Sequence, residues 1–208
     1  MCGTDLSLTK LQYADIKDAN LSGSNLSGAQ MQRAKILFTN LEDANLSFTH
    51  LQVSTLDSST IERADLRQAR LNHTRIINSD FRFADLTAAR LDFSSIQLTR
   101  FNGADLTDAK FVNAHLVDNI FDKSAILLRA SFVGACSTST DFSESNISKC
   151  QINSMFGDTS NFLPSGKGPD SDAWPEHWPK EKLGKDEFER RWRAWQAKEG
   201  YTLNNPTN

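Results

Sequence analysis

The sequence lacks most of the features that mark an enzyme site, a secreted fold or a membrane protein. It has only three cysteines and four histidines, and these residues follow no metal-ligand spacing. It has no run of about 18 apolar residues that could span a membrane, and its first residues do not resemble a signal peptide. We therefore expect a cytoplasmic protein that has no membrane segment, binds no metal or cofactor and is not an enzyme.

Charge of one sign is also scarce. The 208 residues carry a formal net charge of −3, which argues against direct DNA binding by a strongly basic surface. Acidic and basic residues are nearly balanced over residues 1–160, so a continuous acidic surface is not expected either. Hydrophobic residues make up a modest 38%, which is enough for a thin core.

What the sequence does have is a strict period of five. From Leu6 to Phe121 every fifth residue is Leu, Ile, Met or Phe, and the residue two places before each is almost always Ala, Ser or Thr. An α-helix would show a period of 3.6 and a plain strand a period of two. Each five-residue unit therefore offers one large and one small side chain for burial.

The large residues fall into four columns of like side chains when they are sorted at a spacing of 20. The columns begin at Leu6, Leu11, Ile16 and Leu21, and we name the first to fourth faces after them. The first column is leucine throughout, the third is rich in isoleucine, and the fourth ends in Phe81, Phe101 and Phe121. Like side chains stack well on neighbouring strands, so residues 20 apart are predicted to touch in successive coils.

Units such as Ala64-Asp65-Leu66 and Ala84-Asp85-Leu86 resemble the A(D/N)LXX pattern of the pentapeptide-repeat family, over about residues 4–156. The resemblance implies an all-β solenoid, a right-handed quadrilateral β-helix with four pentapeptides per coil and about 7–8 coils. We place this β-helix at residues 1–160. The period slips by one residue between Asp122 and Ala125, which predicts a bulge at one corner. Ser137 occupies a large-residue position, which predicts an imperfect coil there.

Residues 161–208 form a different segment, predicted to be an irregular loop followed by a helix at about 186–198. Asp186 is the predicted N-cap and Gly200 the predicted end. Phe188, Trp192 and Trp195 share one face of this helix, because they lie at i, i+4 and i+7. We predict that they cover the last coils as a cap or form a dimer contact. The extension is similar to one in some bacterial pentapeptide-repeat proteins, so we expect a bacterial protein.

The first coil has no predicted cap. An open coil presents unpaired edges, so a homodimer through an exposed end is one expectation. The other is that the chain is the soluble part of a longer pentapeptide-repeat protein with a membrane anchor, because some longer relatives of the extension carry membrane segments.

Two surface patterns remain as candidate binding features. The position before each large residue holds mainly Asp or Asn on the first face and mainly Lys or Arg on the second, which gives an acidic ladder beside a basic one. Solvated charge balance with weak pairing is the alternative explanation. The third face carries outward apolar residues that predict a protein-contact face, unless the extension packs on them. These residues are Leu37, Phe38, Ile77, Leu98 and Val117.

These features favour a non-enzymatic scaffold that binds a protein partner of unknown identity through the flat faces of a rigid rod. The alternative, implied by the resemblance, is a DNA mimic that modulates a type II topoisomerase such as gyrase. A cluster of arginines would interrupt the phosphate-like surface that such a mimic needs. These residues are Arg63, Arg67, Arg70, Arg75, Arg82, Arg90 and Arg100.

Overall fold

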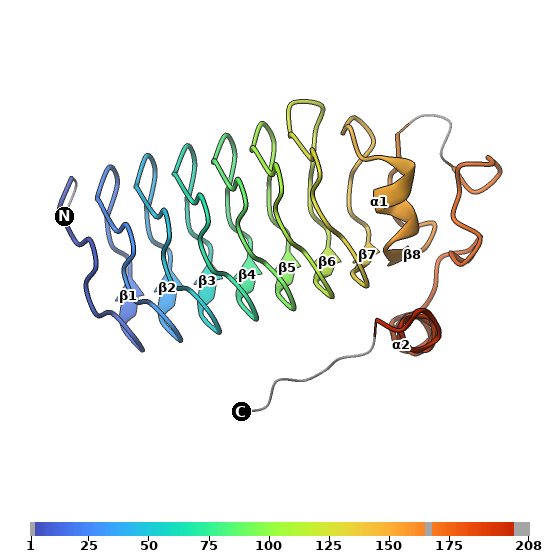
Figure 1. Cartoon of the computed structure of the whole chain (residues 1–208), viewed down its shortest axis with the longest axis horizontal. Helices are drawn as coiled ribbons and strands as arrows, with labels where there is room; N and C mark the ends of the chain where they lie inside the picture. The colour runs from blue at the N-terminus through green and yellow to red at the C-terminus, as the bar shows by residue number, and fades with distance from the viewer. Residues whose placement is uncertain (1–2, 165–167, 202–208) are drawn as a thin grey trace.

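The computed structural model describes residues 3–164 and 168–201, which form a four-sided rod with one parallel strand per coil on its third face (Figure 1). All eight strands belong to one sheet, in chain order from β1 to β8. They are β1 (Asp15–Lys17), β2 (Lys35–Leu37), β3 (Thr55–Asp57), β4 (Arg75–Ile77), β5 (Ser95–Gln97), β6 (His115–Val117), β7 (Cys136–Thr138) and β8 (Phe156–Gly157). The fold is a parallel β-solenoid of about seven turns, which confirms the predicted class.

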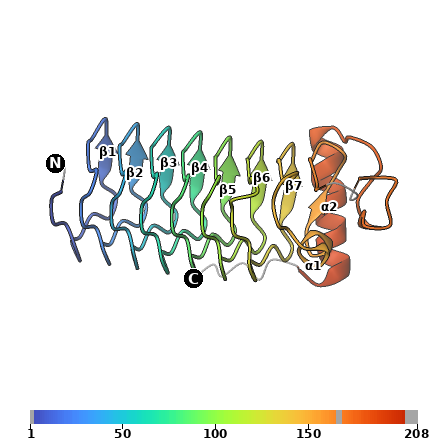
Figure 2. The ribbon, with the colours of Figure 1, turned by 90° about the horizontal axis from the view of Figure 1, so that it is seen from above.

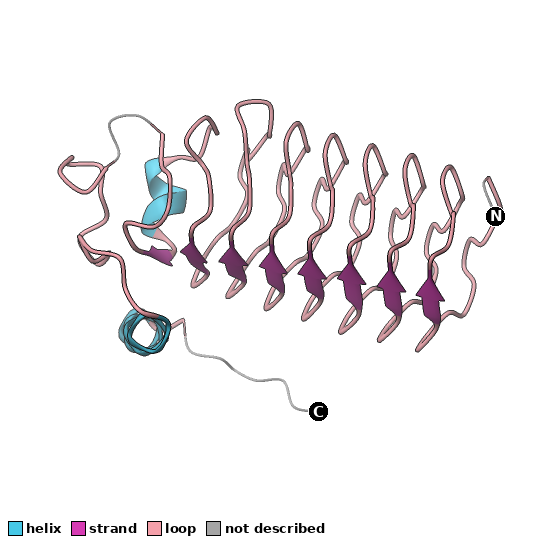
Figure 3. Ribbon diagram, turned by 180° about the vertical axis from the view of Figure 1, so that it is seen from behind, coloured by secondary structure: helices cyan, strands magenta, loops and turns pink. Residues whose placement is uncertain are grey.

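The other three faces are joined by single parallel bridges, also at a spacing of 20. Examples are Asp5↔Asn25 on the first face, Lys10↔Gln30 on the second and Asn20↔Asn40 on the fourth. Four bridging positions per 20 residues confirm the four-sided coil. Figure 3 shows the strands lined up along one side of the rod while the other sides run as turns and loops.

Two kinds of corner separate the faces. After the first, second and fourth faces, a tight turn closes with a backbone hydrogen bond such as Ala69 N to Leu66 O at 3.0 Å. At the corner after the third face, the corresponding amide donates to a side chain of the next coil, as Thr39 N does to Ser59 Oγ at 3.2 Å and Thr99 N to Asn119 Oδ1 at 3.1 Å. Polar residues therefore replace alanine at these inward positions, which satisfies a buried amide.

The interior is filled by the stacked columns. Rings of the fourth column lie parallel, with centroids 5.4 Å apart for Phe81 and Phe101 and 4.8 Å apart for Phe101 and Phe121. Phe111 of the second column meets Phe101 edge to face at 6.5 Å. Both arrangements are favourable for aromatic quadrupoles. The phenylalanine stack predicted from the spacing of 20 is confirmed.

The predicted slip is also present. The bridge spacing is 20 for Arg100↔Ile120 but 21 for Asp105↔Ile126. The extra residue is accommodated at Asp122, whose carboxylate accepts hydrogen bonds from Ser124 N at 3.0 Å and from Gly103 N at 3.2 Å. The side chain thus replaces the carbonyl that would otherwise bind the Gly103 amide.

The coil at Ser137 keeps its register, with Leu116↔Ser137 and Ser137↔Gly157 paired in turn. The irregularity predicted there is therefore absent from the backbone pairing. The buried Ser137 hydroxyl donates to Asn161 Oδ1 at 2.7 Å, and Asn161 Nδ2 returns a bond of 2.8 Å to Ser137 O. This reciprocal pair takes the place of a large apolar side chain.

Two features of the last coil differ from the prediction that the repeat runs to about residue 156. A short helix, α1 (Lys149–Asn153), replaces a unit and begins with a capping box between Ser148 and Gln151. Gln151 Nε2 also donates to Leu127 O at 2.8 Å, which ties α1 to the preceding coil. Parallel bridging continues to Asp141↔Phe162, slightly past the predicted boundary at residue 160.

The extension packs on the end and on the third face of the rod. Trp174 and Trp178 belong to the same hydrophobic cluster as the solenoid interior. The second helix, α2 (Lys185–Glu199), lies against the third face at the C-terminal end of the rod, near β7 and β8 (Figures 1 and 2). It ends at Gly200 as predicted, with φ of 74°. The predicted N-cap is wrong, because Gly184 is the N-cap and Asp186 lies in the first turn.

Candidate interaction surfaces

The acidic ladder of the first face has a structural explanation. Asp65, Asp85 and Asp105 bridge in register along successive coils. Each accepts a hydrogen bond from the backbone N–H two residues on, at 3.0, 2.9 and 2.9 Å respectively. Such local bonds stabilise turns, which explains why Asp and Asn recur at this position. The Arg67 guanidinium also bonds to Asp65, and this bond holds the pKa of Asp65 below its usual value.

The basic ladder of the second face has no comparable explanation. Arg70, Arg90 and Lys110 are exposed and bridge in register, one per coil. The Nε atom of Arg90 lies 3.3 Å from a carboxylate oxygen of the buried Asp92. The side chains of Arg70 and Lys110 have no hydrogen-bond or ion-pair partner among residues 3–164 and 168–201. The cross-face pairing between the two ladders that we considered is not seen in these residues.

The predicted apolar face is divided in the structure. Phe38 and Leu98 are exposed by 55% each at the corner after the third face, whereas Leu37, Ile77 and Val117 are half-buried in the strands. The polar Asp57 and Ser58 occupy the coil between β2 and β4, so Leu37 and Phe38 are separated from the other three residues. The five residues therefore form two groups, and their role as an interface stays a prediction.

Exposed apolar side chains also occupy other corners, where the sequence analysis did not single them out. They are Leu8, Tyr13, Phe48, Val53, Phe83 and Leu128. Two of these side chains pack against a glycine of the next coil. A Cβ at Gly103 would lie 2.4 Å from the Phe83 ring, and one at Gly28 would lie 2.7 Å from Leu8. These glycines also have a positive φ, of 68° and 64°. Each glycine therefore allows the left-handed turn and leaves room for a large apolar side chain of the preceding coil.

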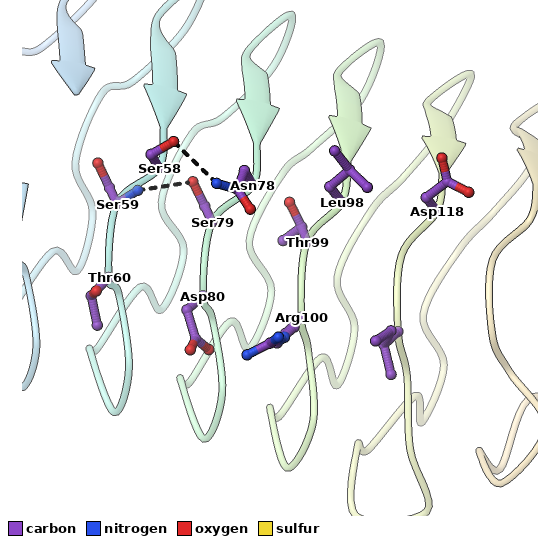
Figure 4. Close-up of a pocket in the computed structure, with 11 residues that line it drawn as sticks. Ser58, Ser59, Thr60, Asn78, Ser79, Asp80, Leu98, Thr99, Arg100 and Asp118 are labelled. Carbon is purple, nitrogen blue, oxygen red and sulfur yellow. Dashed lines mark hydrogen bonds between the residues drawn. The ribbon is translucent and has the colours of Figure 1, made fainter. Parts of the chain in front are cut away.

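A shallow groove of about 400 Å³ runs along the corner between the third and fourth faces (Figure 4). Hydroxyl and amide groups line one part of it, and Asn78 Nδ2 donates to Ser58 Oγ at 3.2 Å. Leu98, Arg100 and Asp118 line the other part. The groove is open and spans several coils, so it offers a surface for contact rather than an enclosed reaction chamber.

The aromatic side chains predicted for a cap or dimer contact are packed within the chain. Phe188, Trp192 and Trp195 are only 4%, 8% and 7% exposed and cluster with Cys136 and Phe156. The indole nitrogen of Trp192 donates to Gly134 O at 3.0 Å. They lie against the third face, while Trp178 covers Gly157 nearer the end of the interior. Their use between two copies stays a prediction.

The spacing of the four histidines indicated scattered surface residues, but two of them are half-buried and contact this helix. The ring of His115 stacks on Trp192 with centroids 5.6 Å apart, and His177 stacks on Trp195 at 4.8 Å. Burial lowers the pKa of both imidazoles, and this effect exceeds that of the nearby Glu189, Lys185 and Arg193 on His115. A cleft of about 390 Å³ lies between α2 and the third face, with His115, Val117 and Phe188 in its wall.

The described residues contain no cluster of three or more His, Cys, Asp or Glu side chains that could hold a metal ion. Cys136 is fully buried under α2, and this burial raises the pKa of its thiol. Within the ranges that the structure covers, no helix is both long enough and apolar enough to cross a bilayer.

The rod is therefore a parallel β-solenoid built from five-residue units. The family model for pentapeptide repeats matches the chain in eight copies, at residues 1–28, 9–47, 56–92, 64–103 and 84–121. These matches cover more than half of the chain, and the protein belongs to the pentapeptide-repeat family.

Solved structures with the same architecture include a trypsin-treated variant of QnrB1, described as a plasmid-mediated fluoroquinolone resistance protein. It is 16% identical with a TM-score of 0.51, over 94% of this chain and 95% of that one. HetL, a pentapeptide repeat protein involved in heterocyst differentiation regulation in the cyanobacterium Nostoc sp. strain PCC 7120, is 21% identical. Its TM-score is 0.38, over 78% of this chain and 84% of that one. No curated protein matches the sequence. At 16% identity, the likeness to QnrB1 shows the fold alone.

Proposed function

We propose that the protein is a non-enzymatic scaffold that binds another protein through the outer faces of its rod. The observation that carries this proposal is the combination of a filled interior with large apolar side chains on the corners. Phe38 and Leu98 are each 55% exposed although the core beneath them is fully packed. Side chains of this size on a rigid surface suit a protein contact, because little conformational entropy is lost when a rigid surface is covered.

The third face is the preferred contact, because its strands β1–β4 lie away from α2, whereas the same sheet meets α2 through His115 of β6, Cys136 of β7 and Phe156 of β8. The partner surface therefore meets Leu37, Ile77 and Leu98 in a flat, mixed apolar and polar environment. A cytoplasmic bacterial location belongs to the same proposal.

Site-specific photo-crosslinking in native cells or lysate tests this function. A photoreactive amino acid replaces Leu98 on the third face, and a second variant carries it at Phe48 as a matched exposed corner position. We expect a discrete crosslinked protein from position 98 and a weaker one or none from position 48. The double variant Leu37→Glu/Leu98→Glu should lose that partner. If neither position yields a crosslinked protein, the scaffold proposal is wrong.

A second candidate is modulation of a type II topoisomerase by mimicry of DNA, as the likeness to QnrB1 over nearly the whole chain suggests. The charge pattern weighs against it, because Arg67 neutralises the acidic ladder at Asp65 and lies 3.7 Å from Asp85. A gyrase supercoiling assay decides it, since a DNA mimic would inhibit supercoiling or relieve drug inhibition at micromolar protein.

A further inference from the structure

The two charged ladders differ in what holds them in place. The aspartates of the first face bond to turn amides and to Arg67, so the fold itself accounts for them. Arg70 and Lys110 contribute no side-chain bond to the part of the rod that the structure describes, yet they occupy equivalent positions on the second face. Structural demands of the turn therefore explain the acidic ladder and leave the basic one unexplained.

Stacking positive charges along the second face is energetically unfavourable. Arg70, Arg90 and Lys110 are direct neighbours along the sheet, at a spacing of about 4.8 Å. Like charges at such positions destabilise a pair of strands. Asp92 is the one acidic residue on the second face between Lys10 and Gly134, and it is buried at 5% exposure. Its carboxylate is bound to Asn72 Nδ2 at 2.9 Å, to Val112 N at 3.2 Å and to Arg90 Nε at 3.3 Å, so it offsets the charge of one rung and leaves those of Arg70 and Lys110. The outer surface of this face therefore stays positive.

The positive second face is bordered by an aromatic pair and, on the next face, by a further arginine. His73 and Phe93 stack with ring centroids 4.9 Å apart at the corner beside the ladder, and form a flat apolar edge. Arg75 lies exposed on the next face and has no ion-pair partner among the described residues. A positive strip with an aromatic border on one side complements a ligand that is acidic along one line and apolar beside it.

The spacing of the three cations indicates whether the ligand is a helix or an extended strand. Three rungs span about 9.6 Å, which is twice the interstrand distance. Acidic residues at i, i+3 and i+6 or i+7 of an α-helix span about 9–10.5 Å, from a rise of 1.5 Å per residue. Alternate residues of an extended strand would span about 13 Å over the same three side chains. The ladder therefore matches a helix that lies along the rod axis.

We propose that the second face binds an α-helix of a partner protein that carries a stripe of acidic residues, with Arg70, Arg90 and Lys110 as the recognition ladder. This inference rests on the proposed scaffold function and gives the chemistry of the partner. Because the rungs come from consecutive coils of a rigid solenoid, the backbone positions of the cations are fixed before binding, and only their side chains lose entropy on contact.

The test uses the full chain and fluorescence anisotropy with labelled synthetic peptides. The first probe is a helical peptide with glutamates at i, i+3 and i+7 on one face. The second has the same composition with the glutamates distributed around the helix, and the third is a single-stranded DNA oligonucleotide of equal charge. The ladder variant is Arg70→Gln/Arg90→Gln/Lys110→Gln. The matched control, Lys123→Gln/Lys180→Gln/Lys198→Gln, removes the same charge from exposed residues elsewhere.

We expect the striped peptide to bind most tightly, with an affinity that falls as salt increases. The ladder variant should weaken this affinity by about tenfold or more, and the control by about twofold or less. Equal losses in both variants, equal binding of the distributed peptide, or tighter binding of the oligonucleotide would each overturn the inference. If the striped peptide fails to bind while crosslinking at Leu98 still yields a partner, this inference is wrong and the scaffold function stands.

Discussion

At the scale of single residues, Gly157 shows how the end of the rod is closed. A Cβ at this position would lie 2.5 Å from the Trp178 ring, whose indole nitrogen donates to Met155 O at 2.8 Å. We expect Gly157→Ala to displace Trp178 and to lower the free energy of unfolding by about 1–3 kcal/mol. Urea denaturation followed by tryptophan fluorescence measures the change.

Gly168→Ala is the matched control, because a Cβ there would meet no atom within 4 Å. It should leave the unfolding midpoint unchanged. A Gly157→Ala protein that unfolds at the same urea concentration as this control would show that the ring does not press on β8.

Val53 is a second informative residue, because it holds a left-handed backbone conformation with φ of 62°. A β-branched side chain is strained there, whereas asparagine tolerates this region well. Val53 is also 52% exposed, so little buried area is lost on replacement. We expect Val53→Asn to raise the free energy of unfolding by about 1 kcal/mol. Val117→Asn, in the extended strand β6, should give no such gain, and a similar gain in both would remove the strain argument.

Residue identity predicted the interior better than the corners. The phenylalanine stack follows from the spacing of 20, because residues in register must touch. The period of five alone did not predict the bond from Thr39 N to Ser59 Oγ, because Ala, Ser and Thr are all small enough for that position. The polar bias of one column only, through Thr39, Ser59 and Thr99, is the signal that distinguishes this corner.

At the scale of elements, docking of α2 should depend on pH. His115 and His177 pack against Trp192 and Trp195, and burial lowers the pKa of both imidazoles in the folded state. The unfolded or undocked chain then binds more protons below its ordinary histidine pKa of about 6.5. The stability that neutral imidazoles contribute is complete above that value and is lost as the pH falls below it.

Hydrogen exchange over residues 185–199 measures this dependence. After correction for the intrinsic exchange rate, protection should fall between about pH 7 and pH 5. The variant His115→Gln/His177→Gln should show a flat profile in that window. The Glu187 carboxylate, whose pKa its bonds to Arg190 and Arg191 lower to about 2, titrates well below it. A wild-type profile as flat as that of the variant would contradict the prediction.

The two helices were predictable to different degrees. The aromatic spacing of Phe188, Trp192 and Trp195 predicted α2, because it has no match in a period of five. Helix α1 carries a Ser148-x-x-Gln151 capping box, but Ile147 and Ile152 preserve the repeat spacing and conceal it. The start of α2 was misplaced because acidic residues suit both an N-cap and a first turn.

At the scale of the whole molecule, the four faces carry different surfaces on one repeated backbone. The first is acidic with its charges bound to turns. The second is basic, and its Arg70 and Lys110 have no side-chain partner among the described residues. The third is partly covered by α2. The side chains inside are nearly interchangeable between coils, while those outside are not. Family membership and rod shape therefore follow from the repeat, whereas the binding surfaces depend on which cations and apolar residues lack partners, and this required the structure.

This organisation predicts how the rod tolerates deletions. Removing residues 61–80 joins Thr60 to Phe81 and keeps every column on its own face, so the shortened protein should fold with a modestly lower melting temperature. Each coil contacts only its neighbours, so the free energy of unfolding loses the contributions of one coil and of one interface between coils. Removing residues 61–70 joins Thr60 to Leu71 instead and turns every later unit by two faces.

The shorter deletion should be the more damaging one. The later coils turn together and keep their own contacts, so the damage lies at the new junction. There Ser59 would face Ala89 instead of Ser79, and the Ser59 amide would lose its hydrogen bond to the Ser79 hydroxyl. A buried polar group that is left unsatisfied in this way costs about 1–3 kcal/mol. Circular dichroism and thermal denaturation of the two proteins decide the matter. If both deletions melt at the same temperature, the four faces are structurally equivalent, and the distinction between the two kinds of corner does not contribute to stability.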